Sequence, residues 1–310
     1  MTKVFIDGSA GTTGLRIHDR LKARSDIEII TLSEELRKDV SARREALNKA
    51  DIAFLCLPDA AAVEAVSLIE NGNTAVIDTS TAHRTTDGWI YGFPELFGQR
   101  ERIKDSKRIA NPGCHASGFI ALVAPLVSAG VISKDEQLSC FSLTGYSGGG
   151  KKMIAEYEDE NRNPLLSAPR QYGLTQQHKH LKEMQNVTGI SNAPAFCPIV
   201  ADFYSGMEVT VPIFAKKLGI TMDGLSAIYE DYYDSGAVYF ERNADEGGFL
   251  SAAALSGRDD MQITLSGNEE RVVLTARYDN LGKGASGAAI QNMNILLGAD
   301  EFSGLGGFFK

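Results

Sequence analysis

A single cysteine, Cys114, lies between a Pro-Gly turn and a stretch of helical character in the segment RIANPGCHASGFIALV. One interpretation is a small buried apolar side chain, which is the usual place of a free cysteine. The other is a nucleophile at a helix N-terminus, where the positive end of the helix dipole favours the thiolate over the thiol. This segment leaves both interpretations open, and the rest of the chain has to distinguish them.

Two of the five histidines, His178 and His180, stand in the segment HKHLKE together with Glu183. A metal site is disfavoured, because side chains at i and i+2 diverge on a helix and no cysteine cluster completes a ligand set. A structural or surface role for one histidine is one alternative. The other is an acid/base partner for Cys114, with Glu183 orienting an imidazole, since catalytic cysteines commonly meet a histidine distant in sequence. His115 adjoins the thiol, but neighbouring helical side chains diverge, so a supporting role is expected for it.

The loop DGSAGTTG carries three glycines in the spacing G-x-x-G-x-x-G. This spacing departs from the common dinucleotide fingerprint and is also compatible with a simple turn. However, the loop lies between an expected strand and an expected helix, where glycines let backbone N–H groups approach a pyrophosphate. We therefore expect a dinucleotide site that includes Gly8, Ser9, Gly11, Thr12, Thr13 and Gly14.

The end of the second expected strand bears on which dinucleotide binds. An NAD site usually offers a carboxylate there for the ribose 2′-hydroxyl. Here Ser33 stands at the tip with Arg37 and Lys38 nearby, which suits the 2′-phosphate of NADP. Glu34 and Glu35 weaken this preference, and Arg37 is alternatively a solvated helix residue. The prediction is NADP, with Ser33 and Arg37 in its site.

Composition excludes several classes of protein. The chain of 310 residues has 43% hydrophobic and 23% charged residues, as ordinary globular proteins do. Its net charge of −9 and the lack of a long basic run argue against nucleic-acid binding. It has no apolar stretch of membrane-spanning length, and the start MTKVFIDGSAG favours a strand and turn over a signal peptide. The four cysteines have no CxxC spacing, which disfavours zinc or a disulfide framework and fits a reducing cytoplasm.

The elements that must position these residues alternate between strand and helix in the first third of the chain. Such alternation predicts βαβ units and a parallel sheet covered on both faces, with ligands at the carboxyl ends of the strands. Cys56 falls inside the third strand, where packing is its expected role. Strands are expected at 3–7, 28–32, 51–58, 74–80 and 108–111, and helices at 15–25, 43–50 and 60–72, the last of them closed by Gly72.

The pattern changes after about residue 112. A helix is expected at 115–130, and the strand-like segments that follow mostly lack a helix after each one. This arrangement favours an α+β domain with a mixed or antiparallel sheet. The segment 282–298 predicts a helix that packs back on the first domain. The later strands are expected at 137–150, 203–215, 237–241 and 271–280.

Six segments run in a recognisable order over nearly the whole chain: DGSAGTTG, IDTSTAHR, YGFPEL, ANPGCHASG, HKHLKE and YDNLGKGASGAAIQNMN. With them the chain resembles the N-acetyl-γ-glutamyl-phosphate reductases of arginine biosynthesis, in particular their shorter form. The wider relatives of that family, aspartate-semialdehyde and glyceraldehyde-phosphate dehydrogenases, share a Rossmann domain and the cysteine–histidine chemistry. The resemblance implies a cytoplasmic, NADPH-dependent reductase of an acyl phosphate that forms a homotetramer or homodimer.

The resemblance also implies roles for particular residues and domains. Cys114 matches the nucleophile and His178 the acid/base histidine. The implied fold is α/β: a doubly wound Rossmann-type domain (1–112 with 285–310) binds NADP, and an α+β catalytic and dimerisation domain covers 113–284. The further residues implied are His180, Glu183, Tyr172 and Asn111 in supporting roles, and Ser80 and Asn280 at the cofactor.

The expected reaction begins with attack of the Cys114 thiolate on the acyl phosphate, which gives a thioester. Only about 3% of a free cysteine is thiolate at pH 7, so a helix N-terminus or a nearby imidazolium has to lower the pKa. NADPH then supplies hydride, His178 moves a proton, and backbone N–H groups stabilise the oxyanion. The candidate cations for phosphate or substrate carboxylate, each equally compatible with a solvated surface charge, are Lys151, Lys152, Arg162 and Arg170.

Two departures and two alternatives accompany the resemblance. Leu181 and Lys182 precede Glu183 where longer members have H-x-P-E, and the glycine loop lacks the aromatic residue of the commoner ASGYTG. Within enzymes, the alternative is reduction of an aspartyl or amino-adipyl phosphate. Outside enzymes, it is an inactive NADP-binding regulator, which predicts loss of the thiol or the histidine, and both are present.

Overall fold

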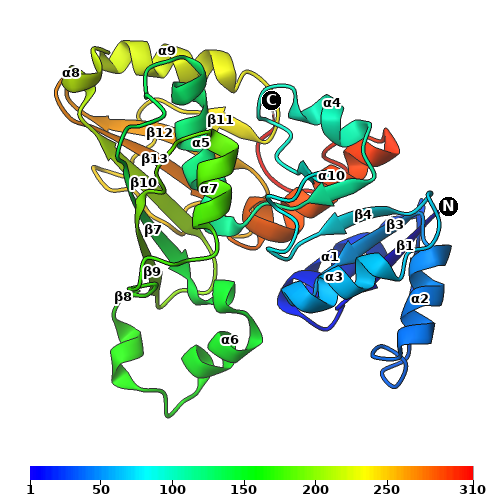
Figure 1. Cartoon of the computed structure of the whole chain (residues 1–310). Coiled ribbons are helices and arrows are strands. Elements are labelled where there is room, and N and C mark those ends of the chain that lie inside the picture. Colours follow the sequence, from blue (N-terminus) through cyan, green and yellow to red (C-terminus); the bar gives the residue numbers. More distant parts are fainter. Residues whose placement is uncertain (310) are drawn as a thin grey trace. The chain divides into compact units, whose positions relative to one another are not determined.

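The computed structural model describes residues 1–309, and the chain divides into two compact units (Figure 1). The sequence-based division placed residues 95–97 in the first domain, but they group with the second unit. The reason is that Glu95 accepts the N–H of Ala237 and pairs with Lys283. The last described residues, from Gly306 on, also group with the second unit, because Gly306 exchanges hydrogen bonds with Asp259. The first unit contains 1–94, 98–112 and 285–305, and the second contains 95–97, 113–284 and the end of the described chain.

The first unit is built on a six-stranded sheet in which every pairing is parallel. Its order is β2-β1-β3-β4-β6-β5, so the chain starts one strand in from an edge, adds β2 on one side and adds the remaining strands on the other. β5 was not predicted, because two residues carry too little periodic signal. The strands are β1 (Thr2–Asp7), β2 (Ile27–Ile30), β3 (Ile52–Leu55), β4 (Ala75–Asp78), β5 (Ile90–Tyr91) and β6 (Arg108–Ala110).

Helices cover both faces of this sheet because successive strand residues point to opposite sides. Val4 of β1 packs with Ile17 and Ile290 on one face, whereas Phe5 packs with Leu47 on the other. The predicted doubly wound fold is therefore confirmed. One face carries α1 (Thr12–Lys22), α4 (Gln99–Lys104) and α10 (Gly287–Leu297), and the other carries α2 (Val40–Lys49) and α3 (Asp59–Ser67).

The prediction that Gly72 closes the third helix was wrong. α3 ends at Ser67, and the chain then turns through Leu68, whose N–H bonds the Glu64 and Ala65 carbonyls. The polar residues that follow bind Asn48 of α2 instead of continuing the helix, with the Glu70 N–H on Asn48 Oδ1. Hydrogen bonds to a distant helix thus shorten α3.

The second unit has a seven-stranded mixed sheet in the order β11-β12-β13-β10-β7-β9-β8, which confirms the prediction of a mixed sheet. The pairs β11–β12 and β7–β9 are parallel, and the other neighbours are antiparallel. β9 was not among the expected strands, and its internal Pro198 is a residue that weakens the signal of a central strand. The strands are β7 (Ser139–Gly145), β8 (Arg170–Gln171), β9 (Ala195–Ala201), β10 (Met207–Ile213), β11 (Val238–Phe240), β12 (Met261–Gly267) and β13 (Val272–Tyr278).

One helix, α5 (Cys114–Ser128), organises the second unit. It is buried over most of its length and contacts α7, α9, β10 and β13, as Figure 1 illustrates. No helix of residues 1–309 has the length and apolar character needed to cross a membrane. The other helical elements are α6 (Gly150–Glu158), α7 (Leu181–Thr188), α8 (Ala215–Leu218), α9 (Met222–Tyr232), the 3₁₀ turns η1 (Tyr146–Gly149) and η2 (Pro164–Ser167), and the π turn η3 (Gly282–Ser286).

Candidate active site

Cys114 is the first residue of α5, directly after the Pro-Gly turn. Gly113 is the N-cap in an extended conformation (φ −80°, ψ 141°) and has no side chain to occupy the helix end. The first-turn N–H groups therefore point toward the end of the helix where the thiol lies, and they favour negative charge there. Cys114 is partly exposed, as are Cys56 and Cys197. Burial of the sulfur raises the pKa of Cys56 to about 12 and also raises that of Cys140, and neither of these two cysteines begins a helix. Cys114 thus combines exposure with a helix N-terminus.

Glu183 connects the nucleophile's turn to the histidine block. Its Oε2 accepts the Gly113 N–H at 3.1 Å, and its Oε1 lies 3.7 Å from His180 Nε2. Both side chains are buried, and Glu183 is only 1% exposed. Although the sequence before Glu183 differs from H-x-P-E, the Glu183 carboxylate still binds Gly113, the residue before Cys114.

His178 and His180 lie in contact, contrary to the sequence argument that i and i+2 side chains diverge. That argument assumed a helix, but α7 begins at Leu181, so both histidines precede it. Their ring centroids are 4.7 Å apart with an interplanar angle of 81°, and the His180 N–H donates to His178 Nδ1 at 3.2 Å. Because a backbone N–H can only donate, Nδ1 accepts, and the neutral His178 ring carries its proton on Nε2.

His115 joins this cluster from the second position of α5. Its Nδ1 lies 2.6 Å from Ser142 Oγ and its Nε2 lies 2.6 Å from the Tyr172 hydroxyl. Burial, and then the neighbouring His178, lower the pKa of His115 to about 3, so its ring is neutral in the working range. Burial, and then the charge of the Cys114 thiolate, raise the pKa of Tyr172, so its phenol stays protonated beside the thiol.

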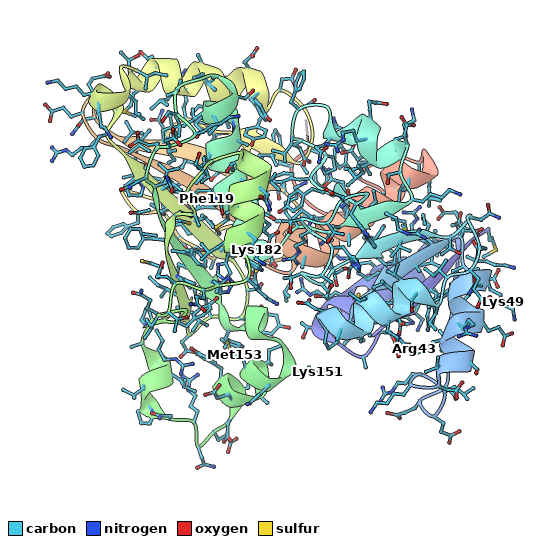
Figure 2. All side chains as sticks on the ribbon, viewed as in Figure 1. Arg43, Lys49, Phe119, Lys151, Met153 and Lys182 are labelled. Carbon is cyan, nitrogen blue, oxygen red and sulfur yellow. The ribbon has the colours of Figure 1, made fainter. Side chains whose placement is uncertain are left out.

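Two of the four candidate cations are engaged by other side chains, and two are exposed. Arg162 makes a two-pronged ion pair with Asp202 at 2.9 and 2.6 Å, and Arg170 binds the Tyr157 hydroxyl and lies over its ring. Lys151 and Lys152 are exposed on α6, where Figure 2 labels Lys151. The two arginines therefore support the local structure, while the lysines remain exposed candidates.

The first unit contains a cavity of about 640 Å³ at the carboxyl ends of β1, β2 and β3. Its walls include the glycine loop, the apolar side chains that follow β2 and β3, and a group of charged side chains. Of the expected cofactor residues in this unit, Gly8, Ser9, Gly11 and Arg37 line it, and Thr12, Thr13, Gly14, Ser33 and Ser80 do not.

The glycine loop has the close backbone approach that a pyrophosphate site needs. Gly8 has φ +88°, and a Cβ there would lie 2.2 Å from the Cys56 carbonyl oxygen. A Cβ on Gly14 would lie 2.5 Å from the Gly8 carbonyl oxygen. α1 begins at Thr12 after an uncapped Gly11, and Thr12 Oγ1 is buried without a hydrogen-bond partner in residues 1–309. These features fit a phosphate group at the start of α1.

Charged residues line the far wall of the cavity. Arg37 pairs with Glu34 at 2.8 Å, and both face the cavity together with Lys38. Arg43 of α2 also lines it, 6% exposed, and binds Asp7 Oδ2 at 3.0 Å. Ser33, which was expected to meet the 2′-phosphate, does not line the cavity. Its carbonyl instead accepts the N–H groups of the turn that carries Arg37.

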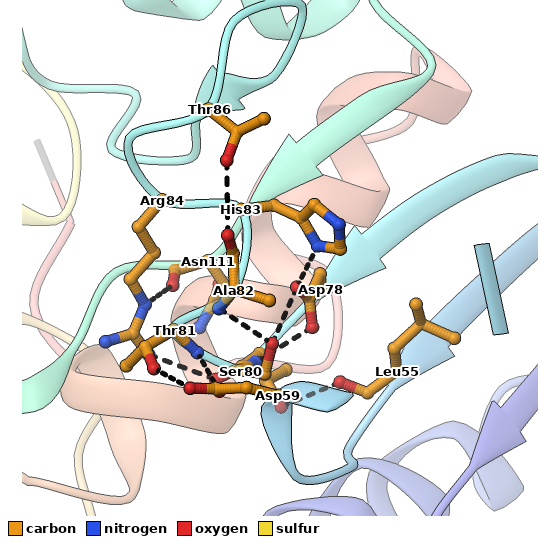
Figure 3. Close-up of polar contacts among 11 residues, drawn as sticks. Leu55, Asp59, Asp78, Ser80, Thr81, Ala82, His83, Arg84, Thr86 and Asn111 are labelled. Carbon is orange, nitrogen blue, oxygen red and sulfur yellow. Dashed lines mark hydrogen bonds and ion pairs between the residues drawn. The ribbon is translucent and has the colours of Figure 1, made fainter. Parts of the chain in front are cut away.

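Ser80 belongs to a buried network in the segment IDTSTAHR (Figure 3). Its N–H and hydroxyl both donate to the Asp78 carboxylate, at 2.9 and 2.8 Å. Asp78 also contacts His83 Nδ1 at 2.6 Å, and His83 stacks on Trp89. Ser80 is thus occupied in shaping the loop after β4.

Asn111 and Asn280 each tie two segments together within their own unit. The Asn111 carbonyl accepts from Arg84 Nε at 2.9 Å (Figure 3), and its Nδ2 donates to the Ala285 carbonyl at 3.0 Å. Asn280 lies in the second unit, where its Nδ2 donates to Ser147 Oγ at 3.0 Å and its Oδ1 accepts the Gly206 N–H. Neither lines the described cavity.

Sequence reasoning did not single out Asp7, Arg43 or Tyr278. Asp7 carries a signal, because it is the last residue of β1 and directly precedes the glycine loop. Tyr278 carries another, since it opens the motif YDNLGKGASG. In the sequence, nothing distinguishes Arg43 from an ordinary cation on the surface of a helix. In residues 1–309, no group of three or more His, Cys, Asp and Glu side chains could hold a metal ion.

The two units correspond to the two domains of the semialdehyde dehydrogenase class. Two family models match accordingly: semialdehyde dehydrogenase, NAD binding domain, over residues 3–106, and semialdehyde dehydrogenase, dimerisation domain, over 114–280. The chain belongs to the N-acetyl-γ-glutamyl-phosphate reductase family, as its curated relatives show.

Those relatives are similar over nearly their whole length. N-acetyl-γ-glutamyl-phosphate reductase 2 from Nostoc sp. is 43% identical over 318 residues, covering 98% of this chain and 99% of the relative. The enzyme of that name from Pseudomonas putida is 45% identical over 312 residues, covering 97% and 98%. N-acetyl-γ-glutamyl-phosphate reductase from Brucella ovis is 45% identical over 306 residues, covering 96% and 99%.

Solved structures share the fold at low identity. Aspartate semialdehyde dehydrogenase II from Vibrio cholerae, complexed with ASA, has a TM-score of 0.68 at 16% identity, covering 96% of this chain and 98% of its own. Aspartate semialdehyde dehydrogenase with NADP from Candida albicans has a TM-score of 0.67 at 12% identity, covering 95% and 98%.

Proposed function

We propose that this protein is an NADPH-dependent reductase that converts N-acetyl-γ-glutamyl phosphate to N-acetylglutamate 5-semialdehyde, with release of phosphate, in arginine biosynthesis. The observation that carries the proposal is the position of Cys114, at the start of α5 and in the same unit as the cluster of His115, His178 and His180. Membership of the reductase family supports the substrate, because the curated relatives bear the name of this activity.

The first unit is proposed to hold NADPH. The N–H groups at the start of α1, with Gly8, Ser9 and Gly11, would face the pyrophosphate, and Arg37 and Lys38 would meet the 2′-phosphate. NADPH, when bound, supplies the hydride that reduces the acyl group. Arg43, held by Asp7 and Glu64, fixes α2 against the end of β1 and so keeps the cavity wall in place.

Cys114 carries the covalent step. Its Sγ attacks the carbonyl carbon of the acyl phosphate, the bond from that carbon to the phosphate oxygen breaks, and phosphate leaves with the electron pair. The product is a thioester on Cys114. The N–H groups of the first turn of α5 stabilise both the starting thiolate and the oxyanion.

His178 is proposed to act at the substrate oxygen. Its Nδ1 accepts from the His180 N–H, so its Nε2–H is the group that can donate to the oxygen as negative charge develops there. When the reduced carbon releases Cys114, the C–S bond breaks, the carbonyl re-forms as an aldehyde, and sulfur leaves as thiolate. Neutral His115 and the protonated Tyr172 keep the surroundings of the thiol free of competing cations.

The protein is further proposed to act as a homodimer or homotetramer in the cytoplasm. Residues 114–280 match a family model described as a dimerisation domain. Ser142 of β7 faces α5 through His115, so its neighbours Phe141 and Leu143 face the other side of the sheet. Phe141 is 45% exposed there, which makes this face the one proposed to meet a second copy. The four cysteines are free, which is compatible with a reducing compartment.

The test is the reverse reaction: phosphate-dependent formation of NADPH from NADP⁺ and N-acetylglutamate 5-semialdehyde. Wild type is compared with Cys114→Ser and with Cys197→Ser, which removes another partly exposed thiol. We expect turnover in wild type and Cys197→Ser and its loss in Cys114→Ser. Turnover only with aspartate or amino-adipate semialdehyde would show that the enzyme reduces the corresponding acyl phosphate instead. Full activity of Cys114→Ser would overturn the role of Cys114.

A further inference from the structure

The hydroxyl of Tyr278 is inserted at the first turn of the helix that carries Cys114. It donates to the Cys114 carbonyl and accepts the Gly118 N–H at 3.0 Å. In an α-helix these two backbone groups, at i and i+4, are the ones that bond to each other. Tyr278 is the last residue of β13 and is fully buried. A side chain from the sheet therefore stands between the Cys114 carbonyl and the Gly118 N–H and hydrogen-bonds to both.

The absence of a side chain at position 118 makes this approach possible. A Cβ on Gly118 would lie 2.7 Å from the Tyr278 hydroxyl oxygen and 2.6 Å from Cγ2 of Val209. Glycine weakens a helix interior by about 1 kcal/mol relative to alanine. Gly118 therefore costs local helix stability and in return admits the tyrosine.

Tyr278 is held on a rigid frame. It pairs with Met207 of β10 on one side and with Met261 of β12 on the other. The next residue, Asp279, is fully buried, and its carboxylate accepts the N–H groups of Leu281 and Gly282. The other oxygen of that carboxylate accepts from the Ser205 hydroxyl and the Gly257 N–H.

The segment that follows Tyr278 also contacts Cys114. An ideal Cβ on Gly284 would lie 3.1 Å from the Cys114 Cβ, so the backbone of the π turn packs closely against the thiol-bearing residue. Lys283, 2% exposed in its side chain, binds both oxygens of the fully buried Glu95 at 2.8 Å and anchors that turn. Residues 278–284 thus contact Cys114 both at its carbonyl and at its Cβ.

We propose that Tyr278 is a positioning residue for the nucleophile: its hydroxyl sets the orientation of the Cys114 peptide, and through it the direction of the Cα–Cβ bond that carries Sγ. This inference rests on the proposed function in taking Cys114 as the nucleophile. The physical reason is that the first turn of a helix frays most easily, because its N–H groups lack intrahelical partners. A hydroxyl delivered by a paired strand holds that turn in one geometry, and reactive atoms gain most from fixed orientation.

The phenol is suited to a constant role. Burial, and then the charge of the Cys114 thiolate, raise the pKa of Tyr278 well above 10. Tyr278 therefore remains a hydrogen-bond donor over the whole working range, and its contribution does not change with pH. It makes no contact with substrate or cofactor in this role, and it acts through Cys114.

The test compares Tyr278→Phe with Tyr233→Phe. The Tyr233 hydroxyl donates to the Ala121 carbonyl of the same helix at 2.8 Å, and Tyr233 is 1% exposed, so the chemical change is matched. The first readout is alkylation of Cys114 in the full-length protein by iodoacetamide, followed by peptide mass spectrometry over a range of pH. Steady-state kcat and KM and the thermal midpoint are measured on the same samples.

We expect Tyr278→Phe to slow Cys114 alkylation and to lower kcat, each roughly tenfold, with a smaller change in KM. Tyr233→Phe should lose thermal stability to a similar degree and leave both rates unchanged. Equal alkylation and kcat in the two variants would overturn the proposal and leave Tyr278 a merely structural residue.

Gly118→Ala approaches the same contact from the helix side, and it decides the matter if Tyr278→Phe does not fold. Its Cβ displaces the hydroxyl without removing it, so slower alkylation of Cys114 is again expected, and an unchanged rate would count against the proposal. Alkylation needs no substrate, which separates the two hypotheses. An effect on alkylation in a protein without reductase activity would sink the proposed function and keep the positioning role.

Discussion

Glu183 accepts the N–H of Gly113, the residue immediately before Cys114, at 3.1 Å. This bond joins the first turn of α7 to the N-terminus of α5 and fixes the residue from which the nucleophile's helix starts. The same carboxylate lies 3.7 Å from His180 Nε2. One buried acid therefore sets the position of the thiol's helix and of the histidine block together.

Replacement of Glu183 separates these two effects. Glu183→Gln keeps an oxygen for the Gly113 N–H, whereas Glu183→Ala leaves that buried N–H unsatisfied. We expect Glu183→Ala to lose about 1–3 kcal/mol of unfolding free energy in urea, and Glu183→Gln much less. Both should lower kcat, because both remove the charge beside His180. An alanine variant as stable as wild type would contradict the role of this bond.

His115 makes stability depend on pH. Its pKa is about 3 in the folded protein against an ordinary value of 6.5, so between these values the unfolded chain binds a proton that the folded one does not. Stability therefore falls as the pH drops from 6.5 toward 3, by up to about 1.4 kcal/mol per pH unit from this residue. Urea unfolding at several pH values should show a shallower dependence for His115→Gln. Identical slopes in the two proteins would rule out a neutral, buried His115.

The glycine loop offers a matched pair of substitutions. Gly8→Ala forces a side chain at φ +88° into the Cys56 carbonyl, whereas at Gly11 the nearest atom to a new Cβ is 3.4 Å away. We expect Gly8→Ala to cost more than about 2 kcal/mol of unfolding free energy and to weaken NADPH binding, and Gly11→Ala to cost less than about 1 kcal/mol. Urea unfolding and NADPH fluorescence measure both effects. Equal losses in the two variants would contradict the close approach at Gly8.

Arg37 is expected to set the preference for the phosphorylated cofactor. Arg37→Ala removes a cation from the cavity wall and should raise the KM for NADPH roughly tenfold while leaving that for NADH unchanged. The control is Arg44→Ala, since Arg44 is half exposed beside Glu70 and does not line the cavity. Equal changes for NADPH and NADH would show that Arg37 does not contact the 2′-phosphate.

The proposed interface between copies is tested at Phe141. Phe141→Asp places a charge on the exposed face of β7 and should shift the protein to a smaller assembly in sedimentation velocity. Val63→Asp is the control, because Val63 is 53% exposed on α3 of the first unit. An unchanged mass for Phe141→Asp would place the interface elsewhere.

Much of the fold follows from local pattern. Alternating strands and helices predict the parallel sheet, because the spacing of apolar residues within each short segment indicates whether that segment is a strand or a helix. β9 and the end of α3 were not predicted, since Pro198 masks the strand and Asn48 of α2 terminates the helix region from outside. The end of α3 is set by a partner distant in sequence, and such a partner leaves no local signal.

The sequence by itself determined the class of fold, the family, and the two segments that carry Cys114 and His178. These depend on residue types and spacings that are local or that resemble a family along the chain. Only the tertiary structure decided what each group touches. The Glu183–Gly113 bond joins residues 70 positions apart and the Tyr278–Cys114 bond residues 164 apart, so both depend on how α7 and β13 pack against α5. The packing of helices and strands brings such distant residues within hydrogen-bond distance. For this physical reason, no spacing of residues in the sequence predicts these bonds.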